Sequence, residues 1–250
     1  MRVILTLVRR ELGSAFQSLT GYVVIAASLL LTGMAIMDLI GWLNDRPTDA
    51  PITELFYQST YFWVILLVVS PVITMRTFAA ERSTGTYEAL MTTPVGDWEV
   101  VLAKFAGAFL FYVLTWLPLL GVLAVLRKVT GETLILDPRV TAVAFLGVFL
   151  VGAVYMSLGL FASSLTRSQI VAAMIALLLG IAMWMLSFRP PTADGIGGAL
   201  GRALEHISLV RQMEDFARGV VDSRHVVFCL SVTGLFLFLT QKVVEGRRWK

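Results

Sequence analysis

Residues 140–188 read VTAVAFLGVFLVGAVYMSLGLFASSLTRSQIVAAMIALLLGIAMWMLSF, and Arg167 is the only charged residue in this stretch. The uncharged segment before Arg167 holds 27 residues and the one after it holds 21. An α-helix needs about 20 predominantly apolar residues to cross the roughly 30 Å hydrocarbon core of a bilayer. The stretch therefore predicts two transmembrane helices joined by a short turn at Arg167.

The composition of the whole chain is also that of a membrane protein. Of its 250 residues, 57% are hydrophobic and only 15% are charged, and the mean hydropathy is +0.81. Soluble domains have about 45–50% apolar and about 25% charged residues. One core of this size could not bury the excess apolar surface, so lipid is expected to be the main solvent.

Four more candidate spans lie elsewhere in the chain. The windows 55–75 and 105–126 carry no charge, and the window 21–42 carries only Asp38. The window 225–241 is shorter, but long basic side chains at its two ends can reach the membrane interface. We therefore expect an all-α polytopic membrane protein with six transmembrane helices. The expected single transmembrane domain is residues 1–250, with spans at about 21–43, 57–77, 101–126, 140–164, 168–188 and 225–243.

The placement of basic residues predicts the orientation of these spans. Six spans put both termini on the same side, and basic residues concentrate on the cytoplasmic side of membrane proteins. With the termini inside, the short inner segments hold 11 Lys and Arg, whereas the short outer loops hold only 4. We therefore expect both termini in the cytoplasm. The outer four are Arg46, Arg127, Lys128 and Arg139.

Several kinds of chemistry find no support in the sequence. One cysteine, Cys229, and two histidines are too few for a disulfide framework or a metal cage. The chain has no G-x-x-x-x-G-K-[ST] loop, no H-E-x-x-H and no G-x-S-x-G, so no enzyme activity of its own is expected. Asp38 is the only ionisable residue within a span and lies near its outer end, which favours a solvated carboxylate over an ion pathway. Secondary transport and nucleic-acid binding are disfavoured, and no bound cofactor is expected.

Residues 1–19 are predicted to form an amphipathic helix that lies in the membrane interface. Arg9, Arg10 and Glu11 follow an apolar run that is too short for a signal peptide, and no small-residue cleavage site follows. A frayed tail with some helical tendency is the alternative. The apolar positions recur at steps of three and four, and they are Ile4, Val8, Leu12, Ala15, Phe16 and Leu19.

The loop of residues 78–96, between the second and third spans, is the longest polar segment on the predicted cytoplasmic side. Within it, one face of a short helix holds Tyr87, Leu90 and Met91. Gly85 permits a bend before this helix and Pro94 ends it. A solvated loop without a partner is the alternative, but such a loop would not need an apolar face. The loop is therefore predicted to contact another protein.

The outer loop of residues 189–224 is predicted to hold two short amphipathic helices, at 199–207 and 209–218. Ser208 can cap the start of the second helix and Gly219 can close its end. Both helices are too short and too charged to cross the bilayer. They could form a lid, but an apolar stripe at helical spacing usually means burial, so packing is favoured. The stripe of the second helix is Leu209, Met213, Phe216 and Val220.

Two stretches carry a resemblance to a known family. Residues 81–104, ERSTGTYEALMTTPVGDWEVVLAK, resemble the loop after the second span of ABC-2-type transporter permeases. The C-terminal part, with FARGVVD at 216–222 and FLFLT at 236–240, resembles the branch that contains gliding-motility and nitrous-oxide-reductase-maturation permeases. The resemblance extends over essentially the whole chain.

The resemblance implies the transmembrane subunit of an ATP-binding cassette transporter in the bacterial cytoplasmic (inner) membrane. Such a subunit dimerises with a second copy or a related permease, binds cytoplasmic ABC ATPase subunits that hold ATP and Mg, and in most relatives exports its substrate. In the gliding-motility branch a large periplasmic accessory subunit is a further partner. The N-terminal interfacial helix and the loop after span 2, as the coupling helix, would receive the motion of the ATPase.

The resemblance also implies which residues contact the ATPase or hold the coupling helix, and none of them is catalytic. On the matching positions they are Glu81, Arg82, Gly85, Thr86, Glu88, Leu90, Thr93, Pro94 and Lys104, with a second, smaller contact around Arg167. A membrane scaffold that recruits an assembly without moving a solute would use the same loop and is the alternative function.

Overall fold

The computed structural model describes residues 2–45, 51–86, 96–130, 137–188 and 207–248. These residues form helices and connecting turns without any β-strand, which confirms the predicted all-α class for this part of the chain. In chain order the elements are α1 (Arg2–Phe16), α2 (Leu19–Asp45), α3 (Ile52–Gln58), α4 (Thr60–Thr74), α5 (Ala79–Ser83), α7 (Asp97–Thr130), α8 (Pro138–Leu165), α9 (Gln169–Met185), the 3₁₀ turn η1 (Leu186–Phe188), α11 (Leu209–Ala217) and α12 (Ser223–Arg248).

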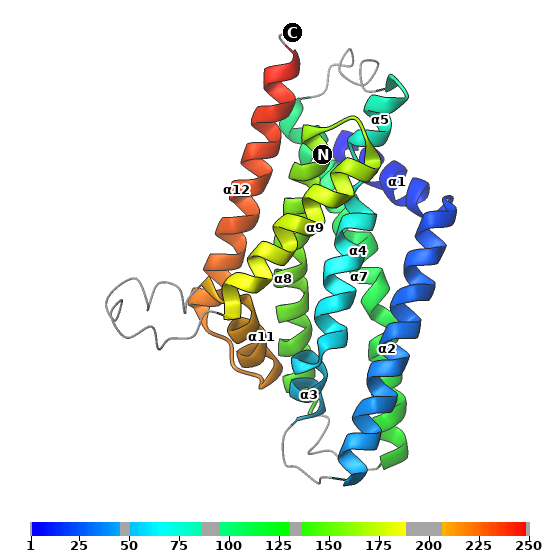
Figure 1. Cartoon of the computed structure of the whole chain (residues 1–250), viewed down its shortest axis with the longest axis vertical. Helices are drawn as coiled ribbons and strands as arrows, with labels where there is room; N and C mark the ends of the chain where they lie inside the picture. Colours follow the sequence, from blue (N-terminus) through cyan, green and yellow to red (C-terminus); the bar gives the residue numbers. More distant parts are fainter. Residues whose placement is uncertain (1, 46–50, 87–95, 131–136, 189–206, 249–250) are drawn as a thin grey trace.

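The long helices run side by side as one bundle, and both termini lie at the same end of it (Figure 1). The helix α1 crosses that end, whereas α3 and α11 lie at the opposite end (Figure 1). We call these two ends the α1 end and the α3 end. The central helix is α8, which contacts α4, α7, α9, α11 and α12.

Small residues on α8 allow its neighbours to approach closely, as is common between helices in membranes. A Cβ atom added at Gly152 would lie 2.1 Å from the ring of Tyr112 on α7. A Cβ atom added at Gly159 would lie 2.1 Å from Oγ1 of Thr74 at the end of α4. No side chain fits at such distances, so these two glycines set how closely α7 and α4 pack on the centre of the bundle.

Five of the described helical segments are long and apolar enough to cross a membrane, which agrees with a multi-pass membrane protein. The sixth predicted span, at residues 168–188, is represented by α9, which has 17 residues and continues into η1. The five long segments are Leu19–Leu43, Thr60–Ser83, Asp97–Lys128, Pro138–Leu165 and Ser223–Gly246.

The second span begins later than the sequence suggests, because the helix is interrupted at Ser59. This residue has an extended backbone, with ψ at 146°, and its hydroxyl donates to the carbonyl of Phe56. Tyr57, the predicted first residue of the span, instead belongs to α3, where its side chain is buried. The short helix α3 packs beside α11 at the α3 end of the bundle.

The N-terminal helix is shorter than the predicted residues 1–19. It ends at Phe16, and a new helix, α2, begins at Leu19. Ser18 occupies the position before α2, and its hydroxyl accepts a hydrogen bond from the backbone N–H of Gly21. This is the usual way in which serine satisfies a free N–H at a helix start, and it fixes a sharp elbow between α1 and α2.

The second of the two predicted outer helices is α11, and it packs against the bundle. Three residues of its predicted stripe, Leu209, Met213 and Phe216, are at most 1% exposed, whereas Val220 is 54% exposed. Phe216 lies directly over Gly147 of α8. The N-cap Ser208 and the left-handed Gly219 (φ +84°) lie where the sequence places them. The first outer helix, predicted at 199–207, falls almost entirely outside the described residues.

Candidate functional site

The candidate site lies at the α1 end, where α5 and the turn before it meet α1, α7 and α8. The central group is the ammonium of Lys104 on α7, which is only 2% exposed. Its Nζ atom lies 3.0 Å from Oε1 of Glu11 on α1 and 2.8 Å from Oε1 of Glu81 on α5. It also donates to the carbonyl of Thr77 at 2.7 Å. One lysine therefore joins three segments that are far apart in the sequence.

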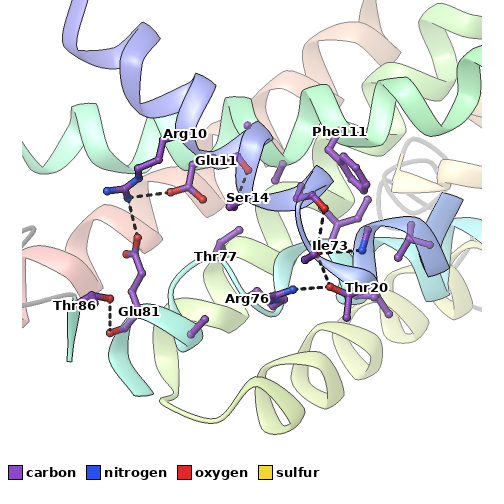
Figure 2. A pocket seen from close by; sticks show the side chains of 18 residues that line it. Arg10, Glu11, Ser14, Thr20, Ile73, Arg76, Thr77, Glu81, Thr86 and Phe111 are labelled. Atoms are coloured by element: carbon purple, nitrogen blue, oxygen red, sulfur yellow. Dashed lines mark hydrogen bonds and ion pairs between the residues drawn. The ribbon is translucent and has the colours of Figure 1, made fainter. Parts of the chain in front are cut away.

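Arg10 completes this group from the outside. Its Nη2 atom lies 2.9 Å from Oε1 of Glu81 and 3.3 Å from Oε1 of Glu11 (Figure 2). With Lys104, each carboxylate therefore has two cationic neighbours. Glu11 and Glu81 are 15% and 18% exposed, whereas Arg10 is 52% exposed. We call Arg10, Glu11, Glu81 and Lys104 the charged junction.

The junction forms because α1 approaches α7 very closely. A Cβ atom added at Gly107 would lie 2.6 Å from Cβ of Glu11. Gly107 is three residues after Lys104, so both lie on the same face of α7. Nearer the elbow, the rings of Phe16 and Phe111 pack edge to face with centroids 5.3 Å apart. A glycine and an aromatic pair thus hold α1 where Glu11 reaches the lysine.

A second set of contacts fixes the same turn to the end of α8. The hydroxyl of Ser163 accepts hydrogen bonds from the backbone N–H groups of Phe78 and Ala79, both at 3.1 Å, and donates to the carbonyl of Met75 at 3.2 Å. The guanidinium of Arg82, only 9% exposed, donates through Nη1 to the carbonyl of Ser164. We call Ser163, Ser164 and Arg82 the serine anchor.

Together, the charged junction and the serine anchor hold α5 from two sides. Hydrogen bonds that involve charged groups contribute about 1.5–3 kcal/mol each, and removing one partner of a buried ion pair costs about 3–5 kcal/mol. The segment 75–83 is therefore attached firmly to α1, α7 and α8 at once. A displacement of α5 must either move these helices with it or break the contacts.

A cavity of about 630 Å³ lies beside the junction, on the inner side of the bend between α1 and α2. Its polar wall includes Arg76, whose Nη1 donates to Oγ1 of Thr20 at 2.6 Å (Figure 2). Its apolar wall comes from α2, α4 and α7 and consists of Val24, Val72, Ile73, Ala108 and Phe111. The cavity thus combines a charged rim with an apolar interior.

The structure brings together some of the site residues that the sequence singled out. Glu81 and Lys104 contact each other directly, and Arg82 lies in the adjacent serine anchor. Gly85 has a left-handed backbone (φ +74°), as a bend there requires, and the hydroxyl of Thr86 donates to the carbonyl of Glu81.

Of the remaining predicted site residues, only Arg167 lies in the described part of the chain. Arg167 is exposed in the turn between α8 and α9 and is not part of the junction. Glu88, Leu90, Thr93 and Pro94 lie outside the described residues, and so does the apolar face expected for the coupling helix.

Sequence reasoning missed Arg10, Glu11, Ser163 and Ser164. One signal for Glu11 was present: it lies three residues after Val8, at the margin of the apolar stripe rather than opposite to it, so a partner was required there. No comparable signal marks the two serines, because serine is common in helix packing within membranes.

A protein-family model described as "ABC-2 family transporter protein" matches residues 6–244 of the chain. The matched region includes the whole charged junction, the serine anchor and all candidate spans except the last two residues of Ser223–Gly246. A search of curated proteins gave no significant match.

Proposed function

The chain belongs to the ABC-2 family of transporter proteins, and from this premise we propose that it is an exporter subunit that works as a dimer and is driven through its α1 end. Membership in the family makes it the permease of an ABC transporter with an ABC ATPase as its partner. The dimer, formed with a second copy or a related permease, the direction of transport and the coupling route described below are the proposed part.

The observation that carries the proposal is that α5 is held on two sides. The charged junction ties it to α1 and α7, and the serine anchor ties the turn before it to α8. Helix α5 (Ala79–Ser83) is itself the first part of the predicted coupling loop of residues 78–96. A partner that moves this loop would therefore move α1, α7 and α8 with it, without needing a contact to each helix.

The proposal places the α1 end in the cytoplasm and six helices in the bacterial inner membrane. The sixth is α9, which with 17 residues spans about 25 Å at 1.5 Å per residue. Seventeen residues is at the short end of the range for a transmembrane helix, and mismatch of this size is absorbed by thinning the bilayer or by flanking side chains. On this arrangement α1 lies in the cytoplasmic interface.

The mechanism follows from these attachments. ATP, bound with Mg in the partner subunits, closes two ATPases and carries the two coupling loops toward each other. Because packed helices shift as rigid units between discrete arrangements, the motion of α5 opens or closes a path at the dimer interface. The exposed turn at Arg167 is the second, smaller contact, and the permease itself needs no cofactor.

The C-terminal sequence suggests the gliding-motility and nitrous-oxide-reductase-maturation branch, and in that case a large periplasmic subunit would be an additional partner. Its docking site would be the α3 end, which this arrangement places outside the membrane.

The first test is affinity purification of the tagged chain from its native membrane in mild detergent, with mass spectrometry of the proteins that co-elute. The proposal expects a P-loop ATPase in a ratio near one to one. A stable complex without any nucleotide-binding subunit would contradict it and would favour the membrane scaffold.

The coupling route is tested on the same complex with Glu81→Ala. A matched control is Glu54→Ala, because Glu54 is similarly buried (13% exposed) and pairs with Arg218 at 2.7 Å, but at the α3 end. In lipid nanodiscs, Glu81→Ala should remove most of the ATP hydrolysis that depends on the permease, while the ATPase stays bound. The coupling route would be refuted if both variants lost the same share of the permease-dependent ATP hydrolysis, or if neither variant lost any.

A further inference from the structure

The cavity beside the charged junction has a wall whose charges do not balance. Glu11 and Glu81 line it, but both carboxylates are already paired with Lys104 and Arg10. Arg76 lines it as well, and within the described residues no carboxylate lies in ion-pair distance of its guanidinium. The two carboxylates, Arg10, Lys104 and Arg76 together carry one net positive charge, located on Arg76.

The guanidinium of Arg76 is positioned rather than free to turn. Its Nη1 donates to Oγ1 of Thr20 at 2.6 Å, and this hydroxyl also lies 2.8 Å from the hydroxyl of Ser18 at the elbow (Figure 2). Arginine has five N–H donors in a planar fork, and the other N–H groups of Arg76 make no hydrogen bond within the described part of the chain. Arg76 is exposed, so a ligand can reach them.

The shape of the cavity restricts the class of ligand. A volume of about 630 Å³ is far more than a small inorganic anion needs, and it is within the range of about 300–1,000 Å³ that is typical of sites for organic molecules. The wall beyond Arg76 is apolar, with Val72 and Ile73 from α4 and Val24 from α2. The ligand should therefore carry an anionic head with an apolar part attached.

We propose that this cavity binds the phosphate headgroup of an anionic phospholipid, and that Arg76 is the residue that recognises the phosphate. Arginine binds phosphate oxygens with two parallel hydrogen bonds. The cavity lies at the end of the spans α2 and α4, where a bilayer places its headgroups, and the apolar wall continues toward the hydrocarbon. Anionic lipids attract basic residues at the cytoplasmic membrane surface.

The proposal needs the membrane placement of the chain but not the coupling to an ATPase, so it is tested on the permease alone. The purified, delipidated chain is titrated in detergent with dioleoyl phosphatidylglycerol, phosphatidylcholine or phosphatidylethanolamine, and bound lipid is counted by native mass spectrometry. All three lipids carry the phosphate, but the ammonium group of phosphatidylcholine or phosphatidylethanolamine would place a second positive charge beside Arg76. We therefore expect at least about tenfold tighter binding of phosphatidylglycerol than of either zwitterionic lipid.

Two variants that each remove one positive charge distinguish lipid binding in the cavity from non-specific electrostatic attraction. Arg76→Gln should weaken binding of phosphatidylglycerol about tenfold and remove the preference. Arg9→Gln, on the exposed side of α1 and outside the cavity, should leave both unchanged. Arg76→Lys keeps the positive charge and should retain part of the preference for phosphatidylglycerol. This result would exclude misfolding as the cause of the weaker binding in Arg76→Gln.

Three results would overturn the proposal. The first is equal weakening in Arg76→Gln and Arg9→Gln, which would mean non-specific attraction. The second is equal binding of phosphatidylethanolamine and phosphatidylglycerol by the wild-type chain. The third is competition by soluble glycerol 3-phosphate at the affinity of the lipid, which would identify a free phosphate compound as the ligand instead.

Discussion

Replacing Lys104 by methionine tests whether the charged junction is a structural unit. Methionine has a similar length and no charge, so the change removes the ammonium while keeping most of the packing. The ammonium contacts Glu11 at 3.0 Å, Glu81 at 2.8 Å and the carbonyl of Thr77 at 2.7 Å, and it is only 2% exposed. After the change, Arg10 alone would face two carboxylates.

The expected cost follows from that arrangement. Removing one partner of a buried ion pair costs about 3–5 kcal/mol. Because the two carboxylates keep some exposure and a second cation, we take the lower limit, about 3 kcal/mol. In a chain of this size 1 kcal/mol shifts the melting temperature by about 2–4 °C, so a loss of about 6–12 °C is expected. Lys128→Met, an exposed lysine on the same helix, should change it by less than about 2 °C.

The triple variant Lys104→Met, Glu11→Gln, Glu81→Gln gives the decisive comparison. Replacing a buried charged group as a whole is often close to neutral, so the triple variant should recover most of the lost stability. Melting is measured in mild detergent by loss of the monodisperse peak in fluorescence-detected size-exclusion chromatography. A single variant that melts like the wild type, or a triple variant that melts no higher than the single one, would refute the reasoning.

Two further predictions concern the elbow and the serine anchor. Gly21→Ala should destabilise the chain by about 1–3 kcal/mol, because the added Cβ atom would lie 2.1 Å from a carbonyl oxygen of α1. The control Gly33→Ala has open space around it and should be neutral or slightly stabilising. The melting temperatures of the two variants check this difference in stability. Ser163→Ala removes the acceptor that this hydroxyl provides for the N–H groups of Phe78 and Ala79 and should cost about 1–3 kcal/mol. Hydrogen exchange of these two amides should accelerate in Ser163→Ala, and unchanged exchange would contradict the anchor.

Five of the six predicted spans correspond to long apolar helical segments in the described part of the chain, because hydropathy largely determines such segments. The sixth predicted span, at 168–188, corresponds to the shorter α9 and η1. The break at Ser59 could not be predicted, because serine is tolerated inside membrane helices and only the packing of α3 beside α11 favours an extended residue there. Val220 illustrates a related limit. It continues the apolar stripe of α11 by spacing, but it follows the left-handed Gly219, after which the helical register no longer applies.

The candidate site was predictable only in part, for a physical reason. Glu81 and Lys104 were singled out through a resemblance of the stretch that contains both, and they prove to be in contact at 2.8 Å. Their partners Arg10 and Glu11 come from a helix about 70 residues earlier in the chain. An amphipathic pattern shows which face of that helix is apolar, but it does not show which other helix the face meets.

The charged junction is not needed to hold α1 on the bundle, and this suggests what it contributes. The apolar side of α1 packs on α7 through Phe16 and Phe111, and a buried ion pair is weak evidence for stability. Its contribution is positional. A displacement of about 1.5 Å along the 2.8 Å contact between Lys104 and Glu81 would take the atoms to about 4.3 Å and break the direct hydrogen-bonded contact. A hydrogen bond requires a particular distance and angle, whereas apolar burial is non-directional. The junction therefore fixes where α5 lies relative to α1 and α7, which is what a segment needs if it is to pass a small displacement of α5 on to both helices.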